Sequence, residues 1–236
     1  MSSLKIYCLW LIAFAAVLPG TLAADIVGTV TLAGTPPPEK PIDFANNPVC
    51  GKLHSGPVTT QFYVVGGQKG LKDVVVMLTG ISGKSTGGSA PPLVLDQKGC
   101  MYVPYIAAVQ TGQKIVVRNS DPELHNVHPT PEANGNEEKN MAQPPGSPDL
   151  EFSFPAAENF VRFKCDVHPW MFAYVTVVDH PYFAVTDKDG KFKIANVPPG
   201  TYTVQAMHRK AGKASQKITV ETNAVTADFT LQVGGG

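Results

Sequence analysis

Residues 165–171 read CDVHPWM, and residues 172–178 continue as FAYVTVV. The first stretch brings the thiol of Cys165, the imidazole of His168 and the thioether of Met171 onto one turn. The second stretch is rich in β-branched and aromatic residues, as buried strands are. Three soft or borderline donors on a tight turn beside a buried strand indicate a metal centre mounted on β-structure.

The donor types on this turn are those that copper prefers in electron-transfer proteins. Such sites combine two imidazoles and a thiolate with a distant axial thioether. The turn supplies all of these except one imidazole, which must come from another part of the chain. His125 is the candidate, in the segment VVRNSDPELHNVHP at 116–129, just after a predicted strand.

The combination of HNV at 125–127 with C-x-x-H-x-x-M at 165–171 resembles the cupredoxin family, and the short ligand loop is similar to that of the amicyanin branch. The resemblance covers about residues 90–180 and includes YVP at 102–104, Gly112 and IVVRN at 115–119. It implies a Greek-key β-sandwich that holds one type 1 copper ion. The ligands that it implies are His125, Cys165, His168 and Met171.

The resemblance also assigns roles around the ligands. Asn126 matches the residue that hydrogen-bonds across the ligand loops in the family, and such bonds orient the ligands. By the same analogy His168 reaches the surface as the electron port, and Pro169 and Trp170 form the docking patch beside it. A transient redox protein would be the partner.

Zinc is the alternative metal. His125 and His128, together with Cys165 and His168, make a complete set of three imidazoles and one thiolate. Met171 would have no role in that site. In a copper site, His128 is either a neighbour of the ligands or an alternative ligand. His54, His180 and His208 show no such spacing.

The chain lacks the signs of a catalyst. Lys164 and Asp166 flank Cys165, whereas copper oxidases and nitrite reductases place a histidine next to the copper cysteine. No G-x-S-x-G, H-E-x-x-H or phosphate-loop motif occurs. We therefore expect a one-electron carrier and no enzyme. A non-redox copper or zinc protein, and an adhesion or scaffold protein without a working metal site, remain the alternatives.

The first residues predict export to the periplasm or the medium. Residues 1–23 join Lys5 to an apolar run and end in small residues, as a cleavable signal peptide does. Cys8 leaves with this peptide, and Cys50 and Cys100 are the candidates for a disulfide. No later stretch is apolar enough to span a membrane.

The C-terminal part predicts a second β-sandwich. FAVTDKDGKFKIANVPPGTYTV at 183–204 resembles the carboxypeptidase regulatory-like domain, a small transthyretin-like sandwich without catalytic residues. Its usual opening elements occur upstream, as IVGTV at 26–30 and VVVMLTG at 74–80. There are two possible arrangements. The second sandwich is either discontinuous, with the copper domain inserted into it, or it follows the copper domain in tandem.

Composition supports an all-β protein with two sandwiches. Of 236 residues, 22 are Gly and 21 are Pro, and charged residues make up only 16%. Positive and negative side chains balance at 19 each, which argues against a nucleic-acid partner. The expected division is a signal peptide at 1–23, a β-segment at 25–81, the copper domain at 90–180 and the second sandwich at 181–233.

Overall fold

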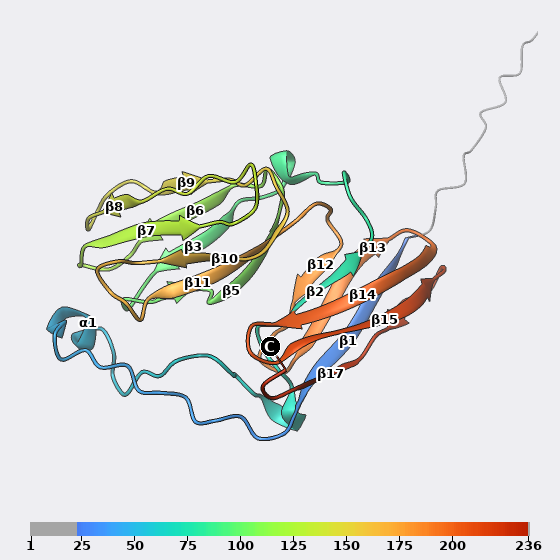
Figure 1. The fold of residues 1–236 in the computed structure, drawn as a ribbon, viewed down its shortest axis with the longest axis horizontal. Helices are drawn as coiled ribbons and strands as arrows, with labels where there is room; N and C mark the ends of the chain where they lie inside the picture. Colours follow the sequence, from blue (N-terminus) through green and yellow to red (C-terminus); the bar gives the residue numbers. More distant parts are fainter. Residues whose placement is uncertain (1–22, 236) are drawn as a thin grey trace, which may run out of the picture.

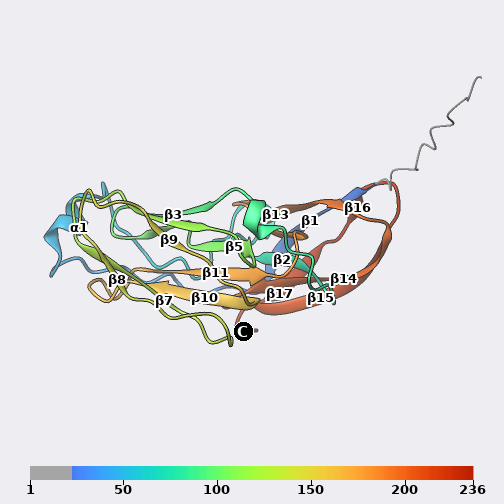
Figure 2. The ribbon, with the colours of Figure 1, turned by 90° about the horizontal axis from the view of Figure 1, so that it is seen from above.

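The structure is a computed structural model that describes residues 23–235, so nearly all of the expected signal peptide lies outside the described residues. The described chain is all-β and forms four sheets that make two sandwiches lying end to end (Figures 1 and 2). Among the described residues, no helix has the length and apolar character needed to cross a membrane.

The first sandwich is continuous in sequence. One sheet has the strand order β5-β11-β10-β7-β8 and the other has the order β4-β3-β6-β9. Its core contains Leu95, Val117 and Phe163, which are fully buried. Its strands are β3 (Leu93–Gln97), β4 (Tyr102–Val103), β5 (Ile106–Gln110), β6 (Ile115–Asn119), β7 (His125–Thr130), β8 (Met141–Gln143), β9 (Leu150–Phe152), β10 (Glu158–Lys164) and β11 (Phe172–Val178).

The second sandwich is assembled from two stretches of chain that flank the first sandwich. One sheet has the order β13-β1-β16, with β17 also on β1, and the other has the order β12-β2-β14-β15. Its core includes Ile26, Leu78 and Ile194. Its strands are β1 (Ala24–Ala33), β2 (Val75–Thr79), β12 (Phe183–Val185), β13 (Lys191–Val197), β14 (Gly200–His208), β15 (Gly212–Val220), β16 (Val225–Thr226) and β17 (Phe229–Gln232).

The strand at the start of the described chain is central to this second sandwich. All three strand partners of β1, namely β13, β16 and β17, lie at the other end of the sequence. A Cβ atom on Gly28 would lie 2.1 Å from the carbonyl oxygen of Ala227, so the close approach of these segments requires glycine. β2 likewise lies between β12 and β14.

Between β1 and β2 the chain leaves the second sandwich and crosses to the far end of the first. There it forms the short helix α1 (Pro48–Lys52), and it returns through the 3-10 turn η1 (Gly67–Lys69) (Figure 1). A second 3-10 turn, η2 (Gly87–Ser89), leads into β3. This excursion places residues 41–60 against the end of the first sandwich.

Three segments depart from long regular strands. Residues 61–65 form no strand and make a single bridge from Val65 to Leu71. Residues 101–108 contain two separate strands, β4 and β5, because Pro104 between them has no amide hydrogen for a ladder. The long polar loop at 129–149 contains the short strand β8.

Candidate metal centre

Three donor side chains meet at the end of the first sandwich. His125 is the first residue of β7, Cys165 follows β10, and His168 lies in the turn before β11. The Nδ1 atoms of the two imidazoles are 3.0 Å apart, and the Cys165 Sγ lies 3.6 Å from Nδ1 of His168 and 4.0 Å from Nδ1 of His125. The neighbouring positions of β7, β10 and β11 in one sheet bring these residues together.

The turn that carries two of the donors is closed by its own backbone. The amide of Cys165 donates to the carbonyl of Met171 at 3.0 Å, and the amide of Met171 donates to the carbonyl of His168 at 2.9 Å. His125, His168 and Met171 are fully buried, and Cys165 is 2% exposed. The donors are therefore held in place and shielded from water.

Asp121 orients the first imidazole. Its Oδ2 lies 3.0 Å from Nε2 of His125, and its two oxygens accept the backbone amides of Gly99 and Cys100 at 2.6 and 2.7 Å. A carboxylate on Nε2 leaves Nδ1 facing the other donors. Burial alone would lower the pKa of His125, but Asp121 and the Cys165 thiolate raise it to about 9.

The other two donors have pKa values that favour metal binding. Burial alone would raise the pKa of the Cys165 thiol, yet hydrogen bonds from His125 and neighbouring backbone groups bring it below its ordinary value. Burial and the nearby charge of His125 lower the pKa of His168. Thiolate and neutral imidazole are the forms that bind metals, so this donor set fits a soft or borderline ion such as copper.

Asn126 connects the two ligand segments. Its Oδ1 accepts the thiol of Cys165 at 3.4 Å and the backbone amide of Asp166 at 2.6 Å. Its Nδ2 donates to the Asp166 carboxylate at 3.0 Å. This amide therefore fixes both the sulfur and the residue beside it.

His128 lies outside the group of three donors. Its Nδ1 is 2.7 Å from Oδ2 of Asp166, and its Nε2 is 2.6 Å from Oε1 of Glu138. Both ring nitrogens thus face carboxylates, and the group formed by His125, Cys165 and His168 does not include it. His128 has the sequence spacing of a zinc ligand, but in the structure it lies in a neighbouring polar cluster with Asp166 and Glu138.

A segment of residues 41–60, which we call the cap, covers the His168 edge of the centre. His168 has no exposed surface, in contrast to the expected surface port. Trp170 is half-buried, with its ring 5.3 Å from that of His168 and 5.2 Å from that of Phe44 in the cap. Pro169 remains exposed.

Three contacts attach the cap to the first sandwich: the packing of Phe44 on Trp170, a disulfide, and a hydrogen bond of His54. A disulfide joins Cys50 of α1 to Cys100. The ring of His54 stacks on Phe44, and its Nε2 lies 2.7 Å from the carbonyl oxygen of Gly99. The indole of Trp170 donates to the carbonyl of Cys100 at 3.1 Å.

Two features of the site had little signal in the sequence. Asp121 lies four residues before His125 in a turn rich in polar residues, and that i,i+4 spacing was its one available signal. Phe44 lies in a Pro-rich stretch, where nothing local indicates that it reaches Trp170. Both depend on contacts that the tertiary fold makes.

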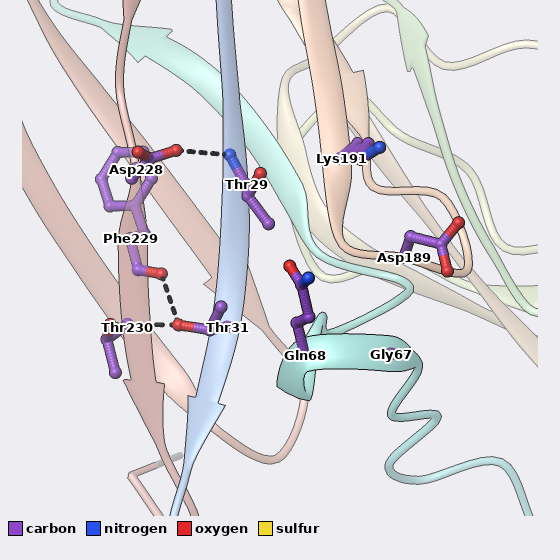
Figure 3. A pocket seen from close by; sticks show the side chains of 9 residues that line it. All are labelled: Thr29, Thr31, Gly67, Gln68, Asp189, Lys191, Asp228, Phe229 and Thr230. Carbon is purple, nitrogen blue, oxygen red and sulfur yellow. Dashed lines mark hydrogen bonds between the residues drawn. The ribbon is translucent and has the colours of Figure 1, made fainter.

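A cavity of about 590 Å³ lies in the second sandwich, away from the donor group (Figure 3). Its walls include Thr29, whose amide donates to Asp228 at 2.8 Å, and the side chain of Gln68. None of the site residues expected from the sequence lines it.

One family model matches part of the chain. The family described as the carboxypeptidase regulatory-like domain matches residues 161–232. The matched range begins in β10 of the first sandwich and omits β1 and β2, which complete the second sandwich in the structure. No curated protein matches the chain.

Several solved structures are similar to part of the chain. A copper-containing nitrite reductase from Thermus scotoductus SA-01 is 16% identical over 38% of this chain and 23% of its own, with a TM-score of 0.33. An oxidized variant of amicyanin is 18% identical over 43% and 97%, with a TM-score of 0.33. A purple cupredoxin from Nitrosopumilus maritimus is 19% identical over 37% and 99%, with a TM-score of 0.31.

The matched segment spans less than a quarter of that reductase but nearly the whole of amicyanin and of the purple cupredoxin. The chain contains an all-β fold of two sandwiches, and the carboxypeptidase regulatory-like domain matches part of the second.

Proposed function

We propose that the protein binds one copper ion through His125, Cys165, His168 and Met171 and carries single electrons. The observation that supports this most is the convergence of two Nδ1 atoms and one Sγ within 4.0 Å of one another in a buried position. Copper bound there would supply a one-electron couple between its two oxidation states.

The protein's own part is to hold the donors still. Asp121 fixes His125, Asn126 fixes the Cys165 sulfur, and the backbone bonds of the turn fix His168 relative to Met171. Donors anchored in this way keep one geometry in both oxidation states. A site that rearranges little exchanges electrons readily, and the chain therefore suits a carrier better than a catalyst.

We infer that the protein works outside the cytoplasm and meets a redox partner transiently. The Cys50–Cys100 disulfide supports an oxidising compartment. Pro169 and Val167, which is 47% exposed, lie on the ligand turn and offer an apolar contact for such a partner. Redox encounters of this kind bury little surface.

A non-redox copper-binding role is the second candidate. The specific observation in its favour is the cap, which removes His168 from the surface through which electrons would pass. Storage or delivery needs the donors but no exposed imidazole edge. Zinc is less well supported, because His128 lies outside the donor group.

The deciding experiment is a Cu(II) titration of the mature protein followed by visible absorption. We expect an intense thiolate-to-copper band that saturates at one copper per chain and bleaches with reductant. Cys165→Ser should lack the band, and His128→Gln, a histidine outside the donor group, should keep it.

Two other outcomes are informative. A band that does not bleach reversibly would favour the non-redox role. Absence of any band in a protein with native circular dichroism would refute the copper assignment.

A further inference from the structure

The disulfide that anchors the cap lies directly beside the candidate copper ligands. The sulfurs of Cys50 and Cys100 and a ring nitrogen of His168 lie within 4.8 Å of one another, and all three residues have no exposed surface. Two cysteine sulfurs and an imidazole at this separation are close to a ligand set for a soft metal ion. In the disulfide form the sulfurs are bonded to each other and cannot serve as thiolates.

His168 has one ring nitrogen that the first centre does not use. Its Nδ1 faces Nδ1 of His125 at 3.0 Å and the sulfur of Cys165 at 3.6 Å. Its Nε2 is buried and has no hydrogen-bond partner among residues 23–235. Leaving such a buried nitrogen unpaired is unfavourable, and an ion on that side of the ring would satisfy it.

The geometry points to a second metal site: we propose that Cys50 and Cys100, once reduced to thiols, bind a soft metal ion together with Nε2 of His168. Cu(I) is the ion that best fits two thiolates and one imidazole. The proposal does not require Cys165 and therefore stands apart from the function proposed above.

Contacts other than the disulfide hold both cysteines in place. The amide and carbonyl of Cys100 are bound by Asp121 and by the indole of Trp170. Cys50 lies in a cap that is also attached through Phe44 on Trp170 and through His54 on Gly99. We therefore expect the two sulfurs to remain neighbours after reduction.

A carboxylate lies within reach of one of these sulfurs. Cys100, Asp121 and His125 also form a group whose ligand atoms lie within 4.8 Å of one another. The Asp121 carboxylate is thus within reach of the Cys100 sulfur, where it stabilises positive charge. Two thiolates next to a carboxylate and an imidazole favour a cation over an anion.

The chemistry is a thiol–disulfide exchange followed by metal binding. A dithiol reductant gives two electrons and two protons to the Cys50–Cys100 bond and is itself oxidised to a disulfide. Binding of Cu(I) then releases the two thiol protons. A disulfide oxidant that accepts the two electrons re-forms the Cys50–Cys100 bond, is itself reduced to two thiols with two protons from water, and expels the ion, so occupancy follows the thiol state of the surroundings.

The test uses full-length mature chain carrying Cys165→Ser, which disables the first centre. The protein is reduced with a phosphine, freed of reductant without air, and titrated with Cu(I) against bicinchoninate. We expect one Cu(I) per reduced chain. The disulfide form should bind Cu(I) at least about tenfold more weakly, because loss of a ligand costs at least as much affinity as loss of a residue that only orients a ligand, which costs about 10–100-fold.

Two variants on this background test the ligand set. Cys50→Ser and His168→Phe should each weaken Cu(I) binding by about tenfold or more, whereas His128→Gln should leave it unchanged. Equal binding by His168→Phe, or equal binding by the disulfide form, would overturn the proposal.

Folding is monitored by near-UV circular dichroism in every sample. Loss of the native signal on reduction would also overturn the proposal, because the site requires the cap to stay in place. If the Cys165→Ser protein is unfolded before reduction, Cys165→Ala serves as the background. Cu(I) binding by the reduced Cys165→Ser chain, together with no copper band in the wild type, would support this second site and contradict the proposed electron carrier.

Discussion

Asp121 holds three groups of the candidate centre with one carboxylate. It accepts the amides of Gly99 and Cys100 and pairs with Nε2 of His125, and its own pKa is lowered: burial would raise it, but these bonds prevail. The carboxylate thereby links the imidazole to the turn that carries the disulfide. A change at this residue should affect the donor geometry without removing a donor.

Asp121→Asn should weaken copper binding by about 10–100-fold, the range for groups that orient metal ligands. The amide is a weaker acceptor for Nε2–H and lacks the charge that favours the present orientation of His125. Competition with a copper chelator measures the affinity. Asp149→Asn is the matched control, because Asp149 pairs with Arg118 on the surface of the same sandwich. Equal affinities for the two variants would contradict the assigned role of Asp121.

The lowered pKa of His208 predicts that the folded protein loses stability in acid. Its Nδ1 accepts the amides of Lys210 and Ala211, and burial together with Arg209 lowers its pKa to about 4 from 6.5. The unfolded chain therefore binds the proton more readily. This contribution to stability is complete above pH 6.5 and is lost as the pH falls toward 4, where the loss reaches about 3 kcal/mol.

His208→Asn provides the comparison, because its Oδ1 can accept the same amides and does not titrate. Urea unfolding at a series of pH values should show the wild type losing more stability than the variant between pH 6.5 and 4. Parallel curves for the two proteins would show that His208 does not control this transition.

At the scale of elements, turns decide where strands meet. The turn at 187–190 is closed by the amide of Gly190, which donates to the carbonyl of Asp187 at 3.0 Å. Gly190 has a φ of +75°, and a Cβ atom there would lie 2.3 Å from the carbonyl oxygen of Val30. The turn therefore packs directly on β1, and its glycine is required both by conformation and by space.

Gly190→Ala should destabilise the second sandwich by roughly 3 kcal/mol or more, as strain and overlap add. Gly34→Ala is the control, because Gly34 also has a positive φ but its nearest neighbour would be an ordinary contact at 3.4 Å. That variant should lose about 1 kcal/mol. Urea unfolding followed by circular dichroism compares the two, and similar losses would mean that the backbone conformation alone matters.

Local patterns predicted most of the strands and the turn at 165–171, because alternation and residue spacing are properties of short stretches. The burial of His168 was not predictable, since it depends on Phe44, Cys50 and the path of a Pro-rich segment across the molecule. His128 shares the spacing of a ligand, yet Asp166 and Glu138 draw its ring into another cluster. Spacing identifies candidate donors, and only the fold selects among them.

At the scale of the whole molecule, the first sandwich is inserted into the second between β2 and β12. These strands are antiparallel neighbours, with Met77 opposite Phe183, so the chain leaves and re-enters at one place. The amide of Gly83 donates to Asp179 at 2.6 Å, which ties the two connections together. The sandwiches also touch, with the guanidinium of Arg209 3.9 Å from the ring centre of Tyr174.

This topology predicts that the second sandwich folds without the first. Replacing residues 84–178 by two glycines joins Gly83 to Asp179, which the hydrogen bond between them already holds close together. The shortened chain keeps β1 between β13 and β16, and β2 between β12 and β14, so both sheets retain their central strands. We expect a β-type circular dichroism spectrum and a single cooperative urea transition.

The fragment 181–236 is the counterpart for a tandem arrangement. It lacks β1 and β2, the central strands of the two sheets, and β1 is the strand that pairs with β13, β16 and β17. The fragment should therefore remain unfolded under conditions in which the shortened chain folds. A folded fragment together with an unfolded shortened chain would reverse the argument, because the C-terminal strands would then form a domain by themselves and β1 and β2 would be additions to it.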